Sequence, residues 1–325
     1  MPEIQKSAVN RVVIDNDDAG QRLDNYLVRV CKGVPKSHVY RILRSGEVRV
    51  NSGRVDAAYR LQAGDTVRIP PIRLAEKPPA TATAEAGMLR ADLPVVYEDD
   101  AFLAINKPAG IAVHGGSGLS FGVIEALRRQ RPQARFLELA HRLDRETSGL
   151  LLIGKKRSAL TALHDLFRHH RADKRYLALA KGRIEKPVTH VQAALHKYLT
   201  EEGERRVSVH EDGKASHSIF RLVARWQSAS LVEAQIKTGR THQIRVHLDH
   251  LGHPILGDEK YGDFALNKAL AKEGLKRMFL HAWRLTFPHP LTGERISLEA
   301  PLPDDLHAYL GRLSAREQQD YGEAI

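Results

Sequence analysis

The chain has 325 residues, enough for two domains of ordinary size. Its 42% hydrophobic and 27% charged residues exclude a disordered chain, a collagen or a coiled-coil rod, and no apolar run approaches the roughly 18 residues that cross a bilayer. The single cysteine, Cys31, excludes an internal disulfide, and the first residues lack the pattern of a secretory signal. We therefore expect a soluble, cytoplasmic protein that does not engage a membrane.

The net charge is strongly basic, with 50 Lys and Arg against 39 Asp and Glu, or +11. Residues 21–73 alone hold eleven basic and four acidic side chains. Such an excess favours a polyanionic partner, because neutralising phosphates releases counterions. The alternative is a solvated basic face that has no partner.

Residues 21–73 are predicted to form a small module of two helices followed by two strands. Hydrophobic residues recur at helical spacing over 23–30, and a second helix is expected to open at Pro35 and to end at Gly46. Alternating hydrophobic residues predict strands at 48–50 and 66–69. One side of the second helix is apolar, and the other side carries Lys36, Arg41 and Arg44. Such a basic face suits contact with RNA phosphates.

This module resembles the RNA-binding domain that is named after ribosomal protein S-four. The resemblance rests on residues 21–24, 34–37, 42–51 and 61–67, and it implies that Lys36, Arg41 and Arg44 contact structured RNA. Residues 76–87 follow, with a double proline and no hydrophobic period, which is typical of a linker. We assign residues 12–73 to the RNA-binding domain, 74–92 to the linker and 93–318 to a second domain.

The second domain alternates strand-like and helix-like segments. Hydrophobic runs predict strands at 95–97, 102–105, 150–153, 176–180 and 231–236, and residues 156–170 carry a helical stripe. Because strands occur in pairs as well as between helices, we expect an α+β fold with a mixed, mainly antiparallel sheet and flanking helices.

Two charged clusters interrupt this pattern. Residues 141–149 place Asp144 among two arginines and a histidine, where cationic neighbours would keep it ionised, although an ion-paired surface turn would have the same composition. In residues 237–248, Thr241 is expected to cap a helix, and Arg240 and Arg245 lie at the strand-to-helix junction. Either arginine can bind phosphate or pair with a carboxylate such as Asp144. The alternative is a capped amphipathic helix with solvated arginines.

Other motifs do not support a competing chemistry. The histidines at 242, 247, 250 and 253 invite a metal site, but only His247 and His250 share a helix face, and no His-Glu-x-x-His pattern occurs. The glycine-rich residues 115–118 lack the lysine of a phosphate-binding loop, and there is no Gly-x-Ser-x-Gly elbow. We expect no metal.

The two clusters resemble the motifs of pseudouridine synthases of the ribosomal large-subunit class. The matching stretches, in chain order, are 106–110 with 114–116, 141–144 with 147–149, 174–179, and 238–247 followed by 252–258. Segments 41–44, 68–71 and 114–125 are most similar to the synthase C subgroup of that family. The resemblance implies isomerisation of specific uridines of large-subunit (23S) rRNA to pseudouridine, without a cofactor.

The resemblance also implies roles for individual residues. Asp144 would act at the sugar, either as a nucleophile at C1′ or as a base at C2′, and the sequence does not choose between these routes. Tyr176 would pack on the flipped uracil, and Arg245 would pair with Asp144. Arg142 would occupy the place of the extracted base. The remaining expected RNA contacts in these motifs are His141 and Arg240.

Two other classes of function stay open. The chain could be a ribosome-assembly or RNA-binding factor in which the pocket is secondary, but the intact set of Asp144, Tyr176 and Arg245 argues against this. A glycosidase that uses Asp144 and Glu146 is weaker, because a basic chain suits RNA better than a neutral sugar. We expect large-subunit rRNA and pre-ribosomal particles as partners, and a monomeric protein.

Overall fold

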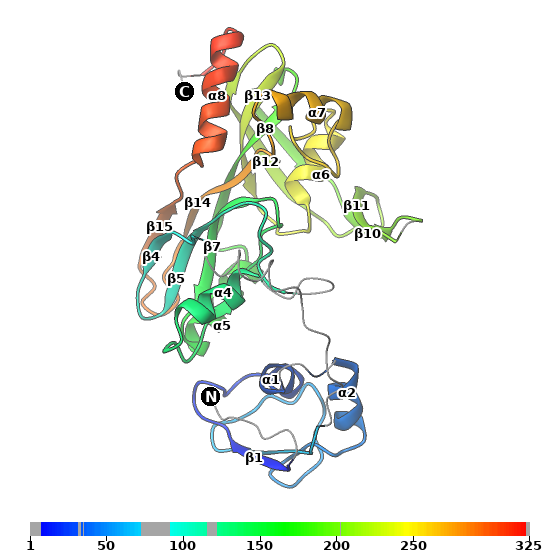
Figure 1. Cartoon of the computed structure of the whole chain (residues 1–325), viewed down its shortest axis with the longest axis vertical. Helices are drawn as coiled ribbons and strands as arrows, with labels where there is room; N and C mark the ends of the chain where they lie inside the picture. The colour runs from blue at the N-terminus through cyan, green and yellow to red at the C-terminus, as the bar shows by residue number, and fades with distance from the viewer. Residues whose placement is uncertain are drawn as a thin grey trace.

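The structure is a computed structural model that describes residues 8–31, 34, 36–72, 92–115, 122–201 and 203–322, without the side chains of Lys36 and Ser37. Apart from Asp92, the predicted linker lies outside the described residues, and so do Pro35 and residues 116–121 of the glycine-rich stretch. The described chain forms an N-terminal module and a larger body, which Figure 1 shows at opposite ends of the molecule.

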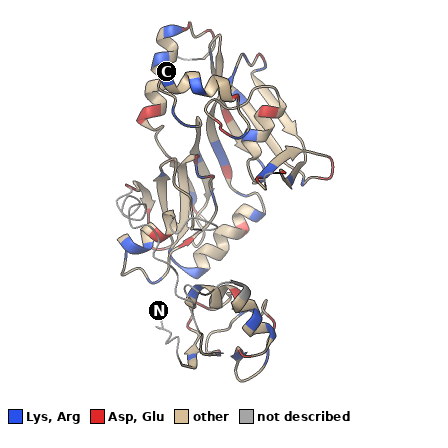
Figure 2. Cartoon of the chain, turned by 45° about the vertical axis from the view of Figure 1, so that its right-hand side comes forward, with Lys and Arg blue, Asp and Glu red and all other residues tan. Residues whose placement is uncertain are grey.

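The N-terminal module packs two helices on a three-stranded antiparallel sheet of order β1-β3-β2. Its elements are β1 (Asn10–Val13), α1 (Leu23–Val30), α2 (Lys36–Arg44), β2 (Arg49–Val50) and β3 (Thr66–Ile69). The predicted helices and strands are confirmed, whereas β1 was not predicted, because only one of its four residues is buried. Val39 and Ile42 of α2 are buried, and Arg41 and Arg44 are exposed on its outer side. Figure 2 shows basic residues along this helix.

The body is built on a ten-stranded sheet. Its main path runs β4-β5-β7-β14-β8-β13-β12-β9, β15 pairs with β14 and β6 with β7, and every pairing is antiparallel except β7 with β14. These strands are β4 (Val95–Glu98), β5 (Phe102–Lys107), β6 (Glu138–Leu139), β7 (Ser148–Gly154), β8 (Asp173–Lys181), β9 (Val188–Gln192), β12 (His217–Arg225), β13 (Ala229–Ile236), β14 (Leu280–Pro288) and β15 (Arg295–Glu299). A separate hairpin joins β10 (Leu195–Leu199) to β11 (Arg205–Val209). The expected α+β fold and mixed, mainly antiparallel sheet are confirmed.

Helices cover both faces of the sheet. They are α4 (Val123–Gln130), α5 (Arg157–Arg168), α6 (Gln243–His250), α7 (Phe264–Lys272) and α8 (Asp304–Arg316). In β7, Leu152 packs in the cluster that contains α5, and Leu151 packs in the cluster that contains α4. In the other half of the sheet, residues of β8 and β13 alternate between α6 and α8 in the same way. Burial on both faces explains why these strands are continuous apolar runs.

The two halves of the sheet meet where β7 lies beside β14. Gly149 has a φ of +112°, and a Cβ at this position would lie 2.2 Å from the carbonyl oxygen of Ala282 in β14. Only glycine therefore permits this close approach. The loop that precedes β7 and carries Asp144 is consequently fixed at the junction of the two halves.

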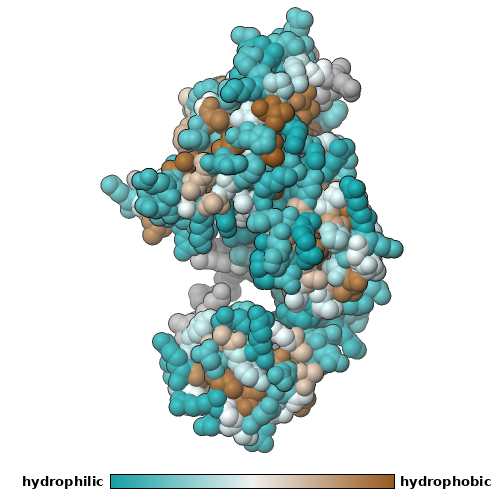
Figure 3. Space-filling view, turned by 180° about the vertical axis from the view of Figure 1, so that it is seen from behind, coloured by the Kyte–Doolittle hydropathy of each residue, from teal (hydrophilic) through white to brown (hydrophobic). Residues whose placement is uncertain are grey.

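The module and the body touch through the first turn of α5. Arg157 donates one hydrogen bond to the side-chain oxygen of Gln21 (2.8 Å) and another to the backbone carbonyl of Asp17 (3.3 Å). In the view of Figure 3, the described parts of the module and the body meet on one side, and a gap separates them beside that contact. Among the described residues, the helices are all too short or too polar to cross a membrane.

Candidate active site

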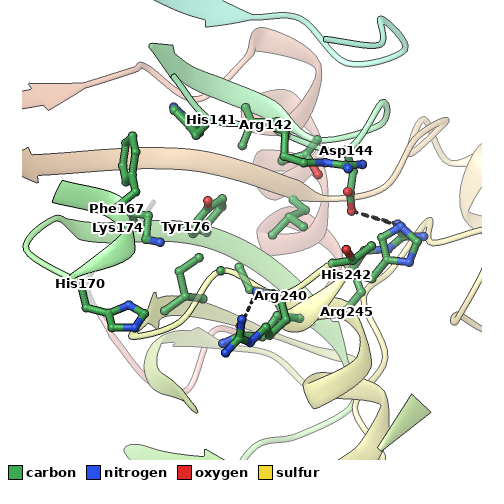
Figure 4. A pocket seen from close by; sticks show the side chains of 18 of the residues that line it. His141, Arg142, Asp144, Phe167, His170, Lys174, Tyr176, Arg240, His242 and Arg245 are labelled. Atoms are coloured by element: carbon green, nitrogen blue, oxygen red, sulfur yellow. Dashed lines mark hydrogen bonds and ion pairs between the residues drawn. The ribbon is translucent and has the colours of Figure 1, made fainter. Parts of the chain in front are cut away.

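The two charged clusters meet in one pocket of about 570 Å³ (Figure 4). The loop between β6 and β7 contributes Asp144, β8 contributes Lys174 and Tyr176, and the turn between β13 and α6 contributes residues 239–242. Arg245 reaches the pocket from the first turn of α6. The structure thus brings Asp144, Tyr176 and Arg245 together from three separate elements.

Asp144 and Arg245 form an ion pair in this pocket. Nη1 of Arg245 donates to Oδ2 of Asp144 at 3.2 Å, and the Asp144 side chain is 20% exposed. Burial lowers the pKa of Arg245, but its hydrogen bonds and its attraction to Asp258 and Asp144 outweigh burial and raise the pKa overall. Arg245 therefore places a permanent positive charge against one carboxylate oxygen of Asp144.

Asp258 holds Arg245 from the opposite side. The guanidinium donates from Nε and Nη2 to the two carboxylate oxygens of Asp258, at 2.7 and 2.8 Å. Asp258 is 1% exposed and also accepts the backbone N–H groups of Lys260 and Tyr261. Burial raises the pKa of Asp258, but the hydrogen bonds and charge of Arg245, together with the two backbone N–H groups, outweigh burial and lower the pKa overall. A bidentate pair of this kind fixes the plane of the guanidinium, and with it the side that faces Asp144.

Tyr176 is held by packing and not by its hydroxyl group. Its ring packs against two hydrophobic clusters of the body, and its hydroxyl has no hydrogen-bond partner among the described residues. Burial, followed by the negative charge of Asp144, raises the pKa of Tyr176, so the phenol is protonated at neutral pH. An unpartnered hydroxyl in a pocket is available to a ligand.

Arg142 and Arg240 lie at the edges of the pocket, and both are exposed. Arg142 lines this pocket and a second hollow of about 740 Å³ beyond Asp144, and no described residue hydrogen-bonds to its side chain. Nε of Arg240 donates to the backbone carbonyl of Ala215 at 3.1 Å. The two predicted RNA contacts thus differ, because the Arg142 side chain has no partner among the described residues, whereas the Arg240 side chain already donates to the backbone.

His141 lines the pocket with a ring that is engaged by the protein. Its Nε2 accepts the backbone N–H of Leu152 at 3.0 Å, and the ring packs on Phe167 at a centroid distance of 5.0 Å. Burial, and then the charge of Lys174, lower the pKa of His141 to about 3. The imidazole is therefore neutral at pH 7, and contact with RNA would have to be made through its remaining edge.

The turn between β13 and α6 differs from the expectation. The prediction that Thr241 caps α6 is wrong, because the N-cap is His242, whose φ of 54° is left-handed and which makes no side-chain cap bond. The Gln243 side-chain oxygen instead accepts from the Thr238 hydroxyl (2.7 Å) and from the Arg240 backbone N–H (3.0 Å). A side chain within the helix thus holds the turn, and the helix starts one residue later than predicted.

Two residues beside Asp144 were not predicted as part of the site. Nε2 of His242 lies 3.8 Å from Oδ2 of Asp144, although the sequence suggested this histidine only as a metal ligand. Lys107 is fully buried, and its Nζ donates to the backbone carbonyls of residues 108, 111 and 145 at 2.8–3.1 Å. Burial lowers the pKa of Lys107 to about 7. The lysine ties the Asp144 loop to β5, and only its place in the 106–110 motif could have indicated this.

The remaining histidines do not assemble a metal site within the described part of the chain. No three His, Cys, Asp or Glu residues gather there in a metal-binding group. His247 is fully buried, and its two ring nitrogens lie 2.9 Å from the hydroxyls of Ser216 and Ser218. Its role in the structure is to join α6 to the sheet.

Comparison with known proteins assigns this chain to a family. Residues 101–250 match the family described as RNA pseudouridylate synthase, and residues 21–67 match the S4 domain. The chain belongs to the RNA pseudouridine synthase family, as its motifs indicated, and is an isomerase. It is 51% identical over 318 residues to ribosomal large subunit pseudouridine synthase C of Pasteurella multocida, covering 98% of this chain and 97% of that protein. It is 52% identical over 309 residues to the protein of the same name from Escherichia coli (strain K12), covering 94% and 97%.

Solved structures show the same fold. Human RNA pseudouridylate synthase domain containing 1 matches with a TM-score of 0.59 and 26% identity, over 72% of this chain and 91% of that one. Human RNA pseudouridylate synthase domain containing 4 matches with a TM-score of 0.58 and 24% identity, over 74% and 98%.

Proposed function

We propose that this protein converts uridines of large-subunit rRNA to pseudouridine, with Asp144 as the catalytic residue. The observation that carries the proposal is the pairing of Asp144 with Arg245 in a pocket that also contains the unpartnered hydroxyl of Tyr176. The relatives from Pasteurella and Escherichia carry the large ribosomal subunit in their names, which supports this substrate.

The reaction breaks the bond from N1 of uracil to C1′, turns the base over, and joins C5 to C1′. The proton that leaves C5 is matched by one gained at N1, so nothing is added or removed overall. Asp144 acts at the sugar, by attack at C1′ or by removal of the C2′ proton. Arg245 orients it through the ion pair at Oδ2. Tyr176 packs on the flipped uracil and assists removal of the C5 proton.

RNA would enter over the cationic edges of this site. Arg142 stands between the two hollows, exposed and unpaired among the described residues, so it is suited to fill the gap that the extracted uridine leaves. The second hollow carries Lys260, Lys276 and Arg277, which would hold phosphates beside the target. The basic residues predicted to contact RNA from α2, Lys36, Arg41 and Arg44, would dock more distant parts of the rRNA.

We further propose that the protein acts as a monomer in the cytoplasm, on free rRNA or on pre-ribosomal particles. The test is to incubate the purified protein with a large-subunit rRNA transcript and to map pseudouridine by chemical modification and sequencing. New pseudouridines at discrete uridines are expected. Binding without any pseudouridine would instead favour an assembly factor.

A further inference from the structure

His242 makes a second contact with Asp144 that the proposed reaction does not use. Its Nε2 lies 3.8 Å from the same oxygen, Oδ2, that accepts the bond from Arg245. His242 has a left-handed φ of 54°, which non-glycine residues rarely adopt. Such a conformation persists only where the surroundings impose it, often at functional sites. We therefore looked for the contacts that hold this ring against Asp144.

The hydrogen bonds of Tyr261 determine which nitrogen of His242 carries the proton. The Tyr261 hydroxyl oxygen accepts the backbone N–H of Val207 at 3.0 Å and lies 2.7 Å from Nδ1 of His242. If Nδ1 carried the proton, the hydroxyl would accept twice, and its own proton would have no acceptor among the described residues. The satisfied arrangement has the hydroxyl donating to Nδ1, which leaves the ring proton on Nε2, facing Asp144.

The ring is neutral at physiological pH. Burial lowers the pKa of His242 to about 4, Arg245 and Lys260 lower it as well, and Asp144 and Asp258 raise it. Tyr261 also packs edge-on against the ring, with the centroids 5.5 Å apart. A neutral ring with its proton on Nε2 offers Asp144 a donor without adding a second positive charge beside Arg245.

One loop holds both groups that face Asp144. Asp258 binds Arg245, and the Asp258 carboxylate also accepts the backbone N–H of Tyr261, whose hydroxyl binds His242. Both groups face Oδ2 of Asp144, and Oδ1 has no hydrogen-bond partner among the described residues. A second donor at Oδ2, beside the hydrogen bond from Arg245, would restrict rotation of the carboxylate and leave the other oxygen free for a ligand.

We infer that His242 is a positioning residue, whose Nε2–H group, set by Tyr261, holds Asp144 with Oδ1 toward the target sugar. The inference rests on the proposed function, in which Asp144 acts at the sugar. The 3.8 Å separation is longer than a hydrogen bond, and contacts of this kind commonly shorten when substrate binds. Helix capping does not account for the ring, because it makes no side-chain cap bond.

The first test compares two substitutions of His242 in the full-length protein. In His242→Gln the amide can place an N–H where Nε2 stands, whereas in His242→Asn the shorter amide reaches Tyr261 but not Asp144. We expect the Gln variant to keep its single-turnover rate on a saturating rRNA fragment within about threefold and the Asn variant to lose about 100-fold, an effect typical of a misplaced reacting group. RNA affinity should be unchanged in both variants.

The second test removes the hydroxyl group that sets the tautomer. Tyr261→Phe keeps the ring, whose centroid lies 5.0 Å from the guanidinium of Arg245, and should lower the single-turnover rate about tenfold without changing affinity. His250→Gln, an exposed histidine at the other end of α6, is the matched control and should turn over at the parental rate. The tautomer is measured directly by long-range ¹H–¹⁵N spectra of the unsubstituted protein, in which His242 should carry its proton on Nε2.

Each contrary result has a separate meaning. A proton on Nδ1, or a parental rate for Tyr261→Phe, would overturn the inference about the tautomer. A parental rate for His242→Asn, or equal losses in the Gln and Asn variants, would overturn the positioning role. If the unsubstituted protein made no pseudouridine, or if Asp144→Asn still made it, the proposed function would fail instead, and the spectra would still report the tautomer.

Discussion

Asp144 is the only carboxylate among the described residues that line the pocket, which makes its substitution the most direct test of the chemistry. Asp144→Asn keeps the size of the side chain but can neither attack C1′ nor remove a proton. We expect its single-turnover rate to fall by about 10³-fold or more, while its affinity for rRNA stays within about twofold. Glu146→Gln, two residues further along the loop, is the control and should remain active. An Asn variant with a rate near the parental value would contradict the catalytic assignment.

The substitution Tyr176→Phe removes the hydroxyl and keeps the ring, so it tests the two contributions separately. The ring should still pack on the uracil, so cleavage of the base from the sugar should survive better than release of product, which requires loss of the C5 proton. The thermal midpoint should not change, because the hydroxyl has no hydrogen bond to lose among the described residues. Release of tritium from C5-labelled RNA measures the affected step. Identical kinetics at every step would reduce Tyr176 to a packing role.

The residues of the site were only partly predictable from the sequence. Asp144, Tyr176 and Arg245 lie in motifs that could be found by resemblance, and the structure brings them into one pocket. Asp258 and His242 lie in the same motifs, but their roles depend on the loop at 258–261, which folds back over the start of α6. No periodicity in the sequence reports such a contact, because it joins an irregular loop to a helix end.

At the scale of elements, several strands and helices with a clear hydrophobic period were predicted, but others, such as α8 with its buried Leu306 and Leu310, were not. The run at 150–153 forms β7 and the stripe at 156–170 forms α5, because burial imposes these patterns. Elements with little burial were missed, among them β1 and the β10–β11 hairpin, whose β10 strand has one buried residue in five. The start of α6 was misplaced because the Gln243 side chain, and not Thr241, satisfies the turn.

Substitution of Lys107 tests how the end of β5 holds the loop that carries Asp144. Lys107→Met preserves most of the side-chain volume but leaves three backbone carbonyls without their donor, and an unsatisfied buried polar group costs about 1–3 kcal/mol. We expect the free energy of unfolding to fall by about 2 kcal/mol and the turnover rate to fall with it, since one of the carbonyls belongs to Arg145, next to Asp144.

Urea denaturation measures this loss. Lys156→Met, at the half-exposed start of α5, is the matched control and should change the free energy of unfolding by less than about 0.5 kcal/mol. If the two variants were equally stable, the three carbonyl contacts of Lys107 would not contribute to the stability of the loop.

At the scale of the whole molecule, buried histidines should make the fold sensitive to acid. Burial lowers the pKa of His281 and of His242 to about 4, below the ordinary value of 6.5. Between pH 6.5 and pH 4 the unfolded chain therefore binds more protons than the folded chain, so the free energy of unfolding falls as the pH falls. We expect a loss of at least about 2 kcal/mol between pH 7 and pH 5, at about 1.4 kcal/mol for each pKa unit.

Urea midpoints at pH 7, 6 and 5 measure this dependence. His281→Gln should flatten it, because His281 is fully buried with both ring nitrogens hydrogen-bonded. The exposed His250, replaced by Gln, should leave it unchanged. A midpoint that is constant or rises toward pH 5 would contradict the role of the buried rings.

We expect the N-terminal module to supply RNA affinity and the body to carry out the reaction. Arg41 and Arg44 are exposed on α2, far along the chain from Asp144, and contacts with phosphates supply affinity that weakens as salt is added. The double variant Arg41→Ala/Arg44→Ala should bind rRNA more weakly and reduce the slope of log K against log salt by about 1–2. Its turnover on a short, saturating substrate should equal that of the parent, because the pocket is intact.

The matched control removes the same charge from the body, through Lys272→Ala and Arg295→Ala, two exposed positions outside both hollows. Because net charge alone acts at long range and weakly, this control should change the salt slope little. The two double variants carry equal net charge, so a difference in slope between them measures direct phosphate contact by α2. Equal slopes in both variants and the parent would mean that the basic face of α2 is solvated and does not dock RNA.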